Sequence, residues 1–338
     1  MPNHPDCPVN YAGFSEFVKE IEGKPRFFII GKGKSGTTWM YYLFRNHPQV
    51  LLMAEERKLF ERPNQNRAAL LEPVLDSGFF LSRFKVSSIG MCFFRETNIR
   101  YELARLLSDY LLFREYGGSD RTRNKAYGFI GEKIALNSQD DAKRLMKYLR
   151  EIYPEVKIIH IVRDPRDVAV SALFHRYRRY KQAGKWRIFT RHVEGLQQQG
   201  SGKSMIGALL TLASHLVEIL RWKKVVETFE RDGVSHYQKD YLRVRYEDLI
   251  SDERNQVKAL LDFIGLDSSG GVLAEIIQAS SFEVLSSGRK AGQEDSRSFF
   301  RKGVSGDWRR YMGRFEAALA RKLLGNMLEK HGYNWREV

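Results

Sequence analysis

The 338-residue sequence has few cysteines, no internal repeat and no long apolar run. Its two cysteines, Cys7 and Cys92, are too few for a disulfide framework or a cysteine zinc site, and they fit a reducing compartment. No stretch approaches eighteen consecutive apolar residues, and the N-terminus lacks the charged and apolar regions of a signal peptide. The sequence therefore predicts a cytoplasmic protein without a transmembrane segment.

Acidic residues are outnumbered by basic ones. The chain has 56 Lys and Arg against 41 Asp and Glu, a formal net charge of +15. This excess predicts an anionic partner, which could be a nucleotide, an acidic substrate, nucleic acid or a membrane surface. A hydrophobic content of 43% and an aromatic content of 12% are those of a globular protein rather than a disordered one.

Short apolar runs alternate with helical patterns along the chain. Strands are predicted at residues 27–30, 50–53, 127–130, 156–162 and 242–246, and helices at 101–113, 140–152, 209–229 and 255–264. Such alternation indicates one α/β domain, residues 26–338 after an N-terminal segment 1–25, with a central parallel sheet flanked by helices. Such a sheet binds ligands at the carboxyl ends of its strands.

The stretch GKGKSGTT, residues 31–38, follows the first predicted strand and resembles a phosphate loop of pattern G-x-x-x-x-G-K-[ST]. Thr37 stands at the lysine position, and the nearest lysine, Lys34, precedes the second glycine, Gly36. Glycine backbone N–H groups, a helix N-terminus, Lys34 and the hydroxyls of Ser35, Thr37 and Thr38 form an anion cradle. The alternative is a turn in which these hydroxyls only cap the helix.

A second strand end carries Arg163, and Ser171 follows eight residues later on the next helix. A planar guanidinium and a hydroxyl could converge there on one phosphate. Alternatively, the RDPRD sequence is a surface turn of self-paired charges. Asp164 allows another function, because with Thr38 it could hold Mg²⁺ as in a P-loop kinase that uses ATP.

The segment FFRKGVSGDW places Arg301, Lys302 and Gly303 in a basic loop. Such a charge run is usually a solvated loop. Here, KSGTTW at 34–39 resembles the 5′-phosphosulfate loop of sulfotransferases that use 3′-phosphoadenosine 5′-phosphosulfate (PAPS), and residues 301–308 resemble their R-K-G-x-x-G-D-W motif. In that family the lysine matching Lys34 touches the oxygen that bridges phosphate and sulfate.

The resemblance implies the P-loop-like fold of that family and assigns further residues to the donor site. Arg163 and Ser171 match its 3′-phosphate motif, Tyr246 matches a tyrosine near the adenine, and SSF at 280–282 is similar to its T-S-F contacts. Trp39 could stack on adenine. The implied nucleotide-binding set is Lys34, Ser35, Gly36, Thr37, Thr38, Trp39, Arg163, Ser171, Tyr246, Ser280, Ser281, Phe282, Arg301, Lys302 and Gly303.

The chain departs from the family at two places. Cytosolic members have Tyr-Pro before the loop lysine, where this chain has Lys32 and Gly33. Small-molecule sulfotransferases carry a histidine base in a K-T-H segment, and the counterpart of that histidine is Ala135, two residues after Lys133.

Glycan sulfotransferases instead use a glutamate after the second strand. NHPQVLLMAEERKLF resembles that segment and implies Glu56 as the catalytic base, with Lys58 in place of a histidine. Lys34 and Lys133 would then complete the catalytic set. The alternatives are that Glu55 holds this role, or that Glu56 is a surface carboxylate.

The predicted function is transfer of a sulfuryl group from PAPS to a hydroxyl of an acceptor, giving adenosine 3′,5′-bisphosphate (PAP), without a metal. The acceptor could be a small molecule, a lipid or a glycan, and basic segments would suit an anionic one. A P-loop kinase is the alternative enzyme. A nucleic-acid-binding protein is a weaker alternative, because no such motif is present, so no nucleic-acid partner is expected. The oligomeric state stays open.

Overall fold

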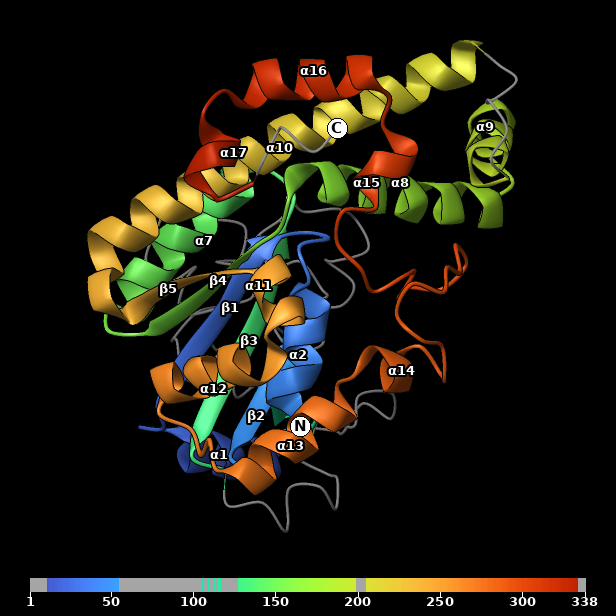
Figure 1. Cartoon of the computed structure of the whole chain (residues 1–338). Helices are drawn as coiled ribbons and strands as arrows, with labels where there is room; N and C mark the ends of the chain where they lie inside the picture. Colours follow the sequence, from blue (N-terminus) through green and yellow to red (C-terminus); the bar gives the residue numbers. More distant parts are fainter. Residues whose placement is uncertain are drawn as a thin grey trace, which may run out of the picture.

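The computed structural model describes residues 11–54, 127–198 and 205–333, with seven isolated positions between 105 and 116 (Figure 1). Its sheet has the strand order β2-β3-β1-β4-β5 with every pair parallel. The strands are β1 (Arg26–Lys32), β2 (Val50–Ala54), β3 (Phe129–Leu136), β4 (Lys157–Val162) and β5 (Tyr241–Arg245). The predicted parallel α/β sheet is confirmed.

Helices connect the strands and cover the sheet (Figure 1). They are α1 (Tyr11–Ile21), α2 (Thr37–Arg45), α7 (Gln139–Ile152), α8 (Pro165–Gln182), α9 (Arg187–Gln197), α10 (Met205–Tyr237), α11 (Tyr246–Ser251), α12 (Glu253–Ile264), α13 (Gly270–Ala279), α14 (Phe282–Leu285), α15 (Trp308–Tyr311), α16 (Arg314–Leu324) and α17 (Met327–Lys330). Most of the helix predicted at 101–113 lies outside the described residues. The last strand was predicted to end at Tyr246. It ends at Arg245, and Tyr246 is the first residue of α11.

Both faces of the sheet are buried, which explains the nearly continuous apolar strands. Phe27 and Ile29 point into a core with side chains of α2, α12 and α13. Their neighbours Phe28 and Ile30 point into the opposite core, with side chains of α7 and α10. A third cluster joins α8, α9, α10 and α15–α17 beyond the carboxyl end of β4 (Figure 1).

The order of the strands locates the ligand-binding edge. β1 lies at the centre of the sheet, between β3 and β4. β2 and β3 lie on one side of it and β4 and β5 on the other, so the strand order switches direction at β1. In such sheets the crevice at the carboxyl ends beside the switch point binds the ligand. The glycine-rich loop after β1 and Arg163 after β4 both lie at this edge.

One helix in the described ranges, Met205–Asp240 with its 3₁₀ extension, is long and apolar enough by length and composition to cross a membrane. This helix was not identified from the sequence as an apolar stretch of that length, because polar residues interrupt it. They are Thr211, Ser214, His215 and Glu218. The helix packs on the sheet and on α7, α8, α9 and α16, so it is part of the folded domain.

Candidate functional site

The glycine-rich loop, Gly31–Gly36, turns the chain from β1 into α2. Lys34 and Gly36 adopt positive φ angles of 77° and 98°. A Cβ at position 36 would lie 2.6 Å from the ring of Tyr246, so only glycine fits here. Gly36 is also the N-cap of α2, which has no side-chain cap. The hydroxyls therefore do not simply cap the helix, and the N–H groups of its first turn face the loop.

Ser35 provides the clearest sign of a binding site in this loop. Its side chain is fully buried, and its Oγ has no hydrogen-bond partner in the part of the chain that the structure describes. A buried hydroxyl without a partner costs free energy unless a ligand or water satisfies it. Thr37 is buried beside it, and Thr38 is half-buried in the first turn of α2.

The ammonium group of Lys34 lies among other cations. Its Nζ is 5.0 Å from the ring centre of Phe299. Burial, together with the charges of Arg178, Lys32 and Lys133, lowers the pKa of Lys34 to about 8, and Glu218 opposes this shift. An anion bound in the loop would relieve this repulsion. Lys133 lies in β3, buried and in register with Ile29 of β1.

A buried ion cluster beneath the loop includes residues that the motifs did not identify. Lys32 Nζ donates to Glu218 Oε2 at 3.0 Å and to Asn137 Oδ1 at 2.9 Å. Glu218 also accepts from Arg176 at 3.1 Å and from Arg221 at 2.9 Å. The only sign of this cluster in the sequence was Lys32 itself, which stands where cytosolic members of the family have the tyrosine of Tyr-Pro. The cluster connects the end of β1 to α8 and α10.

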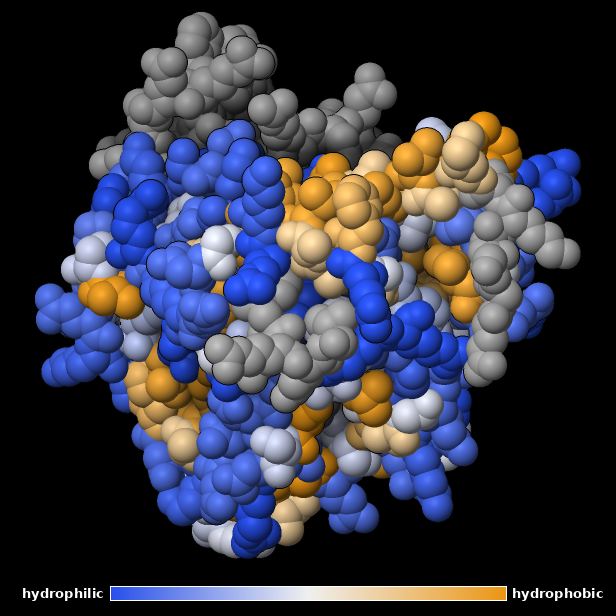
Figure 2. All heavy atoms as spheres, turned by 45° about the horizontal axis from the view of Figure 1, so that its top comes forward, coloured by the Kyte–Doolittle hydropathy of each residue, from blue (hydrophilic) through white to orange (hydrophobic). Residues whose placement is uncertain are grey.

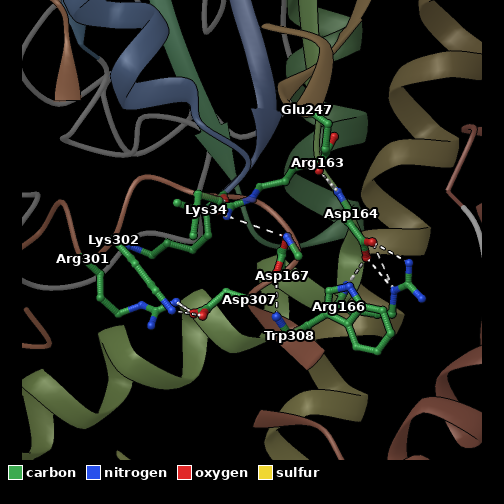
Figure 3. A network of polar contacts seen from close by, with 12 residues as sticks. Lys34, Arg163, Asp164, Arg166, Asp167, Glu247, Arg301, Lys302, Asp307 and Trp308 are labelled. Atoms are coloured by element: carbon green, nitrogen blue, oxygen red, sulfur yellow. Dashed lines mark hydrogen bonds and ion pairs between the residues drawn. The ribbon is translucent and has the colours of Figure 1, made fainter. Parts of the chain in front are cut away.

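Arg163 joins the loop to the C-terminal segment (Figure 3). It donates to the carbonyl of Val304 at 2.9 Å and to that of Lys34 at 3.4 Å. Its guanidinium lies 4.4 Å from the ring centre of Tyr246. Its Nε is buried and has no partner among the described residues. This side chain therefore keeps one donor without a partner, and Ser171 is half-buried on α8.

The metal-binding alternative at Asp164 conflicts with its contacts. Asp164 caps α8 by accepting from the backbone N–H of Arg166. Both of its carboxylate oxygens also accept from the Arg166 guanidinium, at 2.9 Å from Nε and 2.6 Å from Nη2 (Figure 3). A carboxylate paired in this way is not available to Mg²⁺. The charges of the RDPRD sequence are thus self-paired, since Arg163 Nη2 also lies 4.0 Å from Asp167 Oδ2. Asp164, Arg166 and Asp167 are buried, however, so the sequence is not a surface turn.

Two aspartates hold the C-terminal segment, residues 286–308, in place. Asp167 of α8 accepts from the backbone N–H groups of Gly306 at 2.6 Å and Trp308 at 2.9 Å. Asp307 pairs with Arg301 and, at 2.5 Å, with Lys302 (Figure 3). The basic run is therefore paired and partly buried, which differs from the usual solvated loop.

The residues expected near the adenine come together from three distant parts of the chain. Trp39 Nε1 donates to the carbonyl of Ser280 at 3.0 Å, and its ring meets that of Tyr246 edge to face. The Ser280 hydroxyl donates to the carbonyl of Ile276 at 2.5 Å, and the Ser281 hydroxyl caps α14. Both hydroxyls thus have partners within the chain. Gly303 lies directly against the ring of Phe282.

The predicted base cannot be located in this site. Glu56, with Glu55 and Lys58, lies outside the described residues. Strand β2 ends at Ala54, two residues earlier in the sequence. Ala135 is in β3, so no histidine occupies that position.

Comparisons with known proteins agree with this geometry. The chain is 26% identical to bovine sulfotransferase 1A1 over 188 residues (51% of this chain, 56% of that protein). It is 30% identical to flavonol 3-sulfotransferase of Flaveria bidentis over 171 residues (46% and 49%). The chain thus spans about half the length of the curated relatives it matches.

A solved structure and a family model extend the comparison to nearly the whole chain. Sulfotransferase STF9 of Mycobacterium avium shares the fold at a TM-score of 0.50 and 12% identity, covering 96% of this chain and 81% of that one. The sequence model of the sulfotransferase domain matches residues 24–330. The kinase alternative has no support from these comparisons. The chain therefore belongs to the sulfotransferase domain family.

Proposed function

We propose that the protein transfers the sulfuryl group of PAPS to a hydroxyl of an acceptor and releases PAP. The observation that carries the proposal is the buried, unpartnered hydroxyl of Ser35, which lies next to Lys34 and the uncapped N-terminus of α2. Hydroxyl, ammonium and backbone N–H donors at one point suit the oxygens of a phosphosulfate. Bound PAPS supplies an activated sulfuryl group with a phosphate leaving group.

The residues around the loop have separate roles in this proposal. Lys34 donates to the leaving phosphate oxygen, where negative charge develops during transfer. Arg163, Ser171, Arg301 and Lys302 hold the 3′-phosphate, and Trp39, Tyr246, Ser280, Ser281 and Phe282 flank the adenine.

Removal of the acceptor proton requires a base. We propose Glu56 as this base. Lys133 would complete the catalytic set together with Lys34. Support for Glu56 comes from its position two residues after β2, because the carboxyl ends of parallel strands meet at the edge that carries the loop. Glu56→Gln should abolish turnover and leave PAP binding nearly unchanged, and full turnover would exclude Glu56 as the base.

For the acceptor and the location we propose a hydroxyl-bearing organic molecule in the cytoplasm. One relative is named a flavonol 3-sulfotransferase and another a cytosolic sulfotransferase, number 10 of Arabidopsis thaliana. The cations Lys34, Lys133 and Arg178 at the loop would favour an acceptor with an anionic group. A screen of hydroxyl compounds with labelled PAPS identifies it.

Titration calorimetry with PAP, 5′-AMP and ATP with Mg²⁺ tests the donor assignment without an acceptor. We expect PAP to bind most tightly. Arg163→Ala should weaken PAP binding much more than 5′-AMP binding, whereas Arg231→Ala, far along α10, should change neither. Equal losses for both nucleotides would exclude a 3′-phosphate role for Arg163, and tightest binding of ATP with Mg²⁺ would favour the kinase alternative.

A further inference from the structure

The first half of α10 has its polar and apolar faces reversed. From Met205 to Leu220 the buried polar positions are Thr211, Ser214, His215 and Glu218. The outward positions Met205, Ile206, Leu209, Val217 and Leu220 are apolar and between 38% and 79% exposed. A surface helix normally buries its apolar face, so this arrangement is unusual. We call these five residues the α10 stripe.

Two of the inward polar residues take part in the ion cluster beneath the glycine-rich loop. Ser214 and Glu218 accept from Arg176 at 2.6 Å and 3.1 Å, and Glu218 also accepts from Lys32 beneath the glycine-rich loop. His215 faces Glu316 of α16 at 3.4 Å. This ion cluster explains why Ser214 and Glu218 point inward. The buried Thr211 hydroxyl has no partner among the described residues. The cluster does not explain why every outward position is apolar.

The second half of the same helix is ordinary. Trp222, Val226 and Phe229 are buried, while Arg221, Lys224 and Arg231 are exposed. The reversal therefore ends between Leu220 and Arg221. In the view of Figure 2, apolar side chains gather on the face that carries α10. A contiguous exposed apolar surface of this kind marks an interaction site.

Basic residues and a tryptophan gather at the α8–α9 corner, which α9 connects to the N-terminal end of the stripe. α9 packs against this end of α10, where Gly207 lies against the side chain of His192. The α8–α9 corner exposes Trp186 and Ile188, and Trp186 stacks on Tyr180. Its exposed cations are Arg179, Lys181, Lys185, Arg187 and Arg191. Glu194, the one acidic residue between positions 179 and 198, pairs with Lys181 at 2.6 Å.

We propose that the α10 stripe and the α8–α9 corner dock the protein on the surface of an anionic lipid bilayer. Apolar side chains next to cations and an exposed tryptophan suit the boundary between headgroups and acyl chains. Anionic lipids attract each nearby cation by about 1 kcal/mol. The helix lies on the surface and does not cross the bilayer, because its inward face is tied to α8 and β1 by Glu218.

Vesicle flotation of the full chain tests the proposal. We expect flotation with vesicles of phosphatidylcholine and phosphatidylglycerol and much less with phosphatidylcholine alone. Leu209→Ser should weaken the binding about tenfold, since burying a leucine contributes roughly that factor. Val234→Ser is the matched control, because it changes an equally exposed apolar residue of α10 beyond the reversal.

Charge reversal tests the other half of the surface. Arg187→Glu should weaken binding to the anionic vesicles about tenfold and more so at low salt, while Arg231→Glu should leave it unchanged. Three results would overturn the proposal: no flotation of the unmodified chain, equal losses in Leu209→Ser and Val234→Ser, or a dimer in light scattering that Leu209→Ser converts to monomer. The last would make the stripe a contact between two copies.

Discussion

The glycine-rich loop and the C-terminal segment both accept hydrogen bonds from Arg163 but are held in different ways. In the loop, the backbone N–H of Gly33 donates to Leu136 at 3.0 Å and that of Ser35 to Lys32 at 3.1 Å. At the end of the loop, the carbonyl of Gly36 accepts from the N–H of Met40 in α2 at 3.1 Å, so β3 and α2 hold its two ends.

The segment has a few backbone bonds of its own, such as Gly292 N–H to the carbonyl of Lys302 at 2.8 Å. Side chains add to them, chiefly Asp167, Asp307 and Arg289, whose guanidinium contacts four oxygen atoms of the segment. The loop is built into the sheet, and the segment is attached to it by charge.

The largest expected effect is on the chemistry at the loop. Lys34→Met should lower kcat by about 10²–10³-fold, because it removes the cation next to the leaving phosphate. The fold should be unaffected, since the backbone holds the loop. Turnover of labelled PAPS measures the effect, and circular dichroism checks the fold. A loss of less than tenfold would contradict the role given to Lys34.

The ion cluster beneath the loop should affect stability. Glu218→Gln leaves the cation of Lys32 buried without its carboxylate, which costs about 3–5 kcal/mol of unfolding free energy. The double change Lys32→Met with Glu218→Leu should recover most of it, because apolar residues of similar size replace a buried ion pair well. Urea denaturation measures both. If the double variant is as unstable as Glu218→Gln, the pair is not what stabilises this edge.

Loss of a carboxylate at the segment should have a smaller effect. Asp167→Asn removes one of two carboxylate oxygens that accept from Gly306 and Trp308, a loss of about 1–3 kcal/mol. PAP affinity should fall about tenfold, and its dependence on salt should increase. Asp262→Asn on α12 is the control, since Asp262 pairs only on the exposed surface. Unchanged PAP affinity would show that the segment is held without Asp167.

The smallest effect is a pH dependence that belongs to the loop alone. Burial lowers the pKa of Lys34 to about 8, so its charge is lost as the pH rises through that value. kcat/KM should fall about threefold between pH 7.5 and 8.5. Lys34→Arg should remove this decline, because a guanidinium stays charged. A decline that persists in Lys34→Arg would assign it to another group.

The sequence was most informative where neighbours in the chain act together. The spacing of Gly36 and Lys34, and of Arg163 and Ser171, predicted a phosphate site at strand ends, and alternating patterns predicted the parallel sheet. Both follow from short-range geometry, since a strand, a turn and a helix start are set by about ten consecutive residues. The assignment of Glu56 stays a prediction.

Tertiary structure alone decided which charges meet. Lys32 and Glu218 are 186 positions apart, and nothing local to either residue predicts their contact. Asp167 likewise accepts from the backbone N–H groups of Gly306 and Trp308, which are 139 and 141 positions away in the sequence. The same holds for α10, because a helix is usually expected to bury its apolar side. Here the buried cations Lys32 and Arg176 require a carboxylate, and Glu218 provides it from the inward face of the helix.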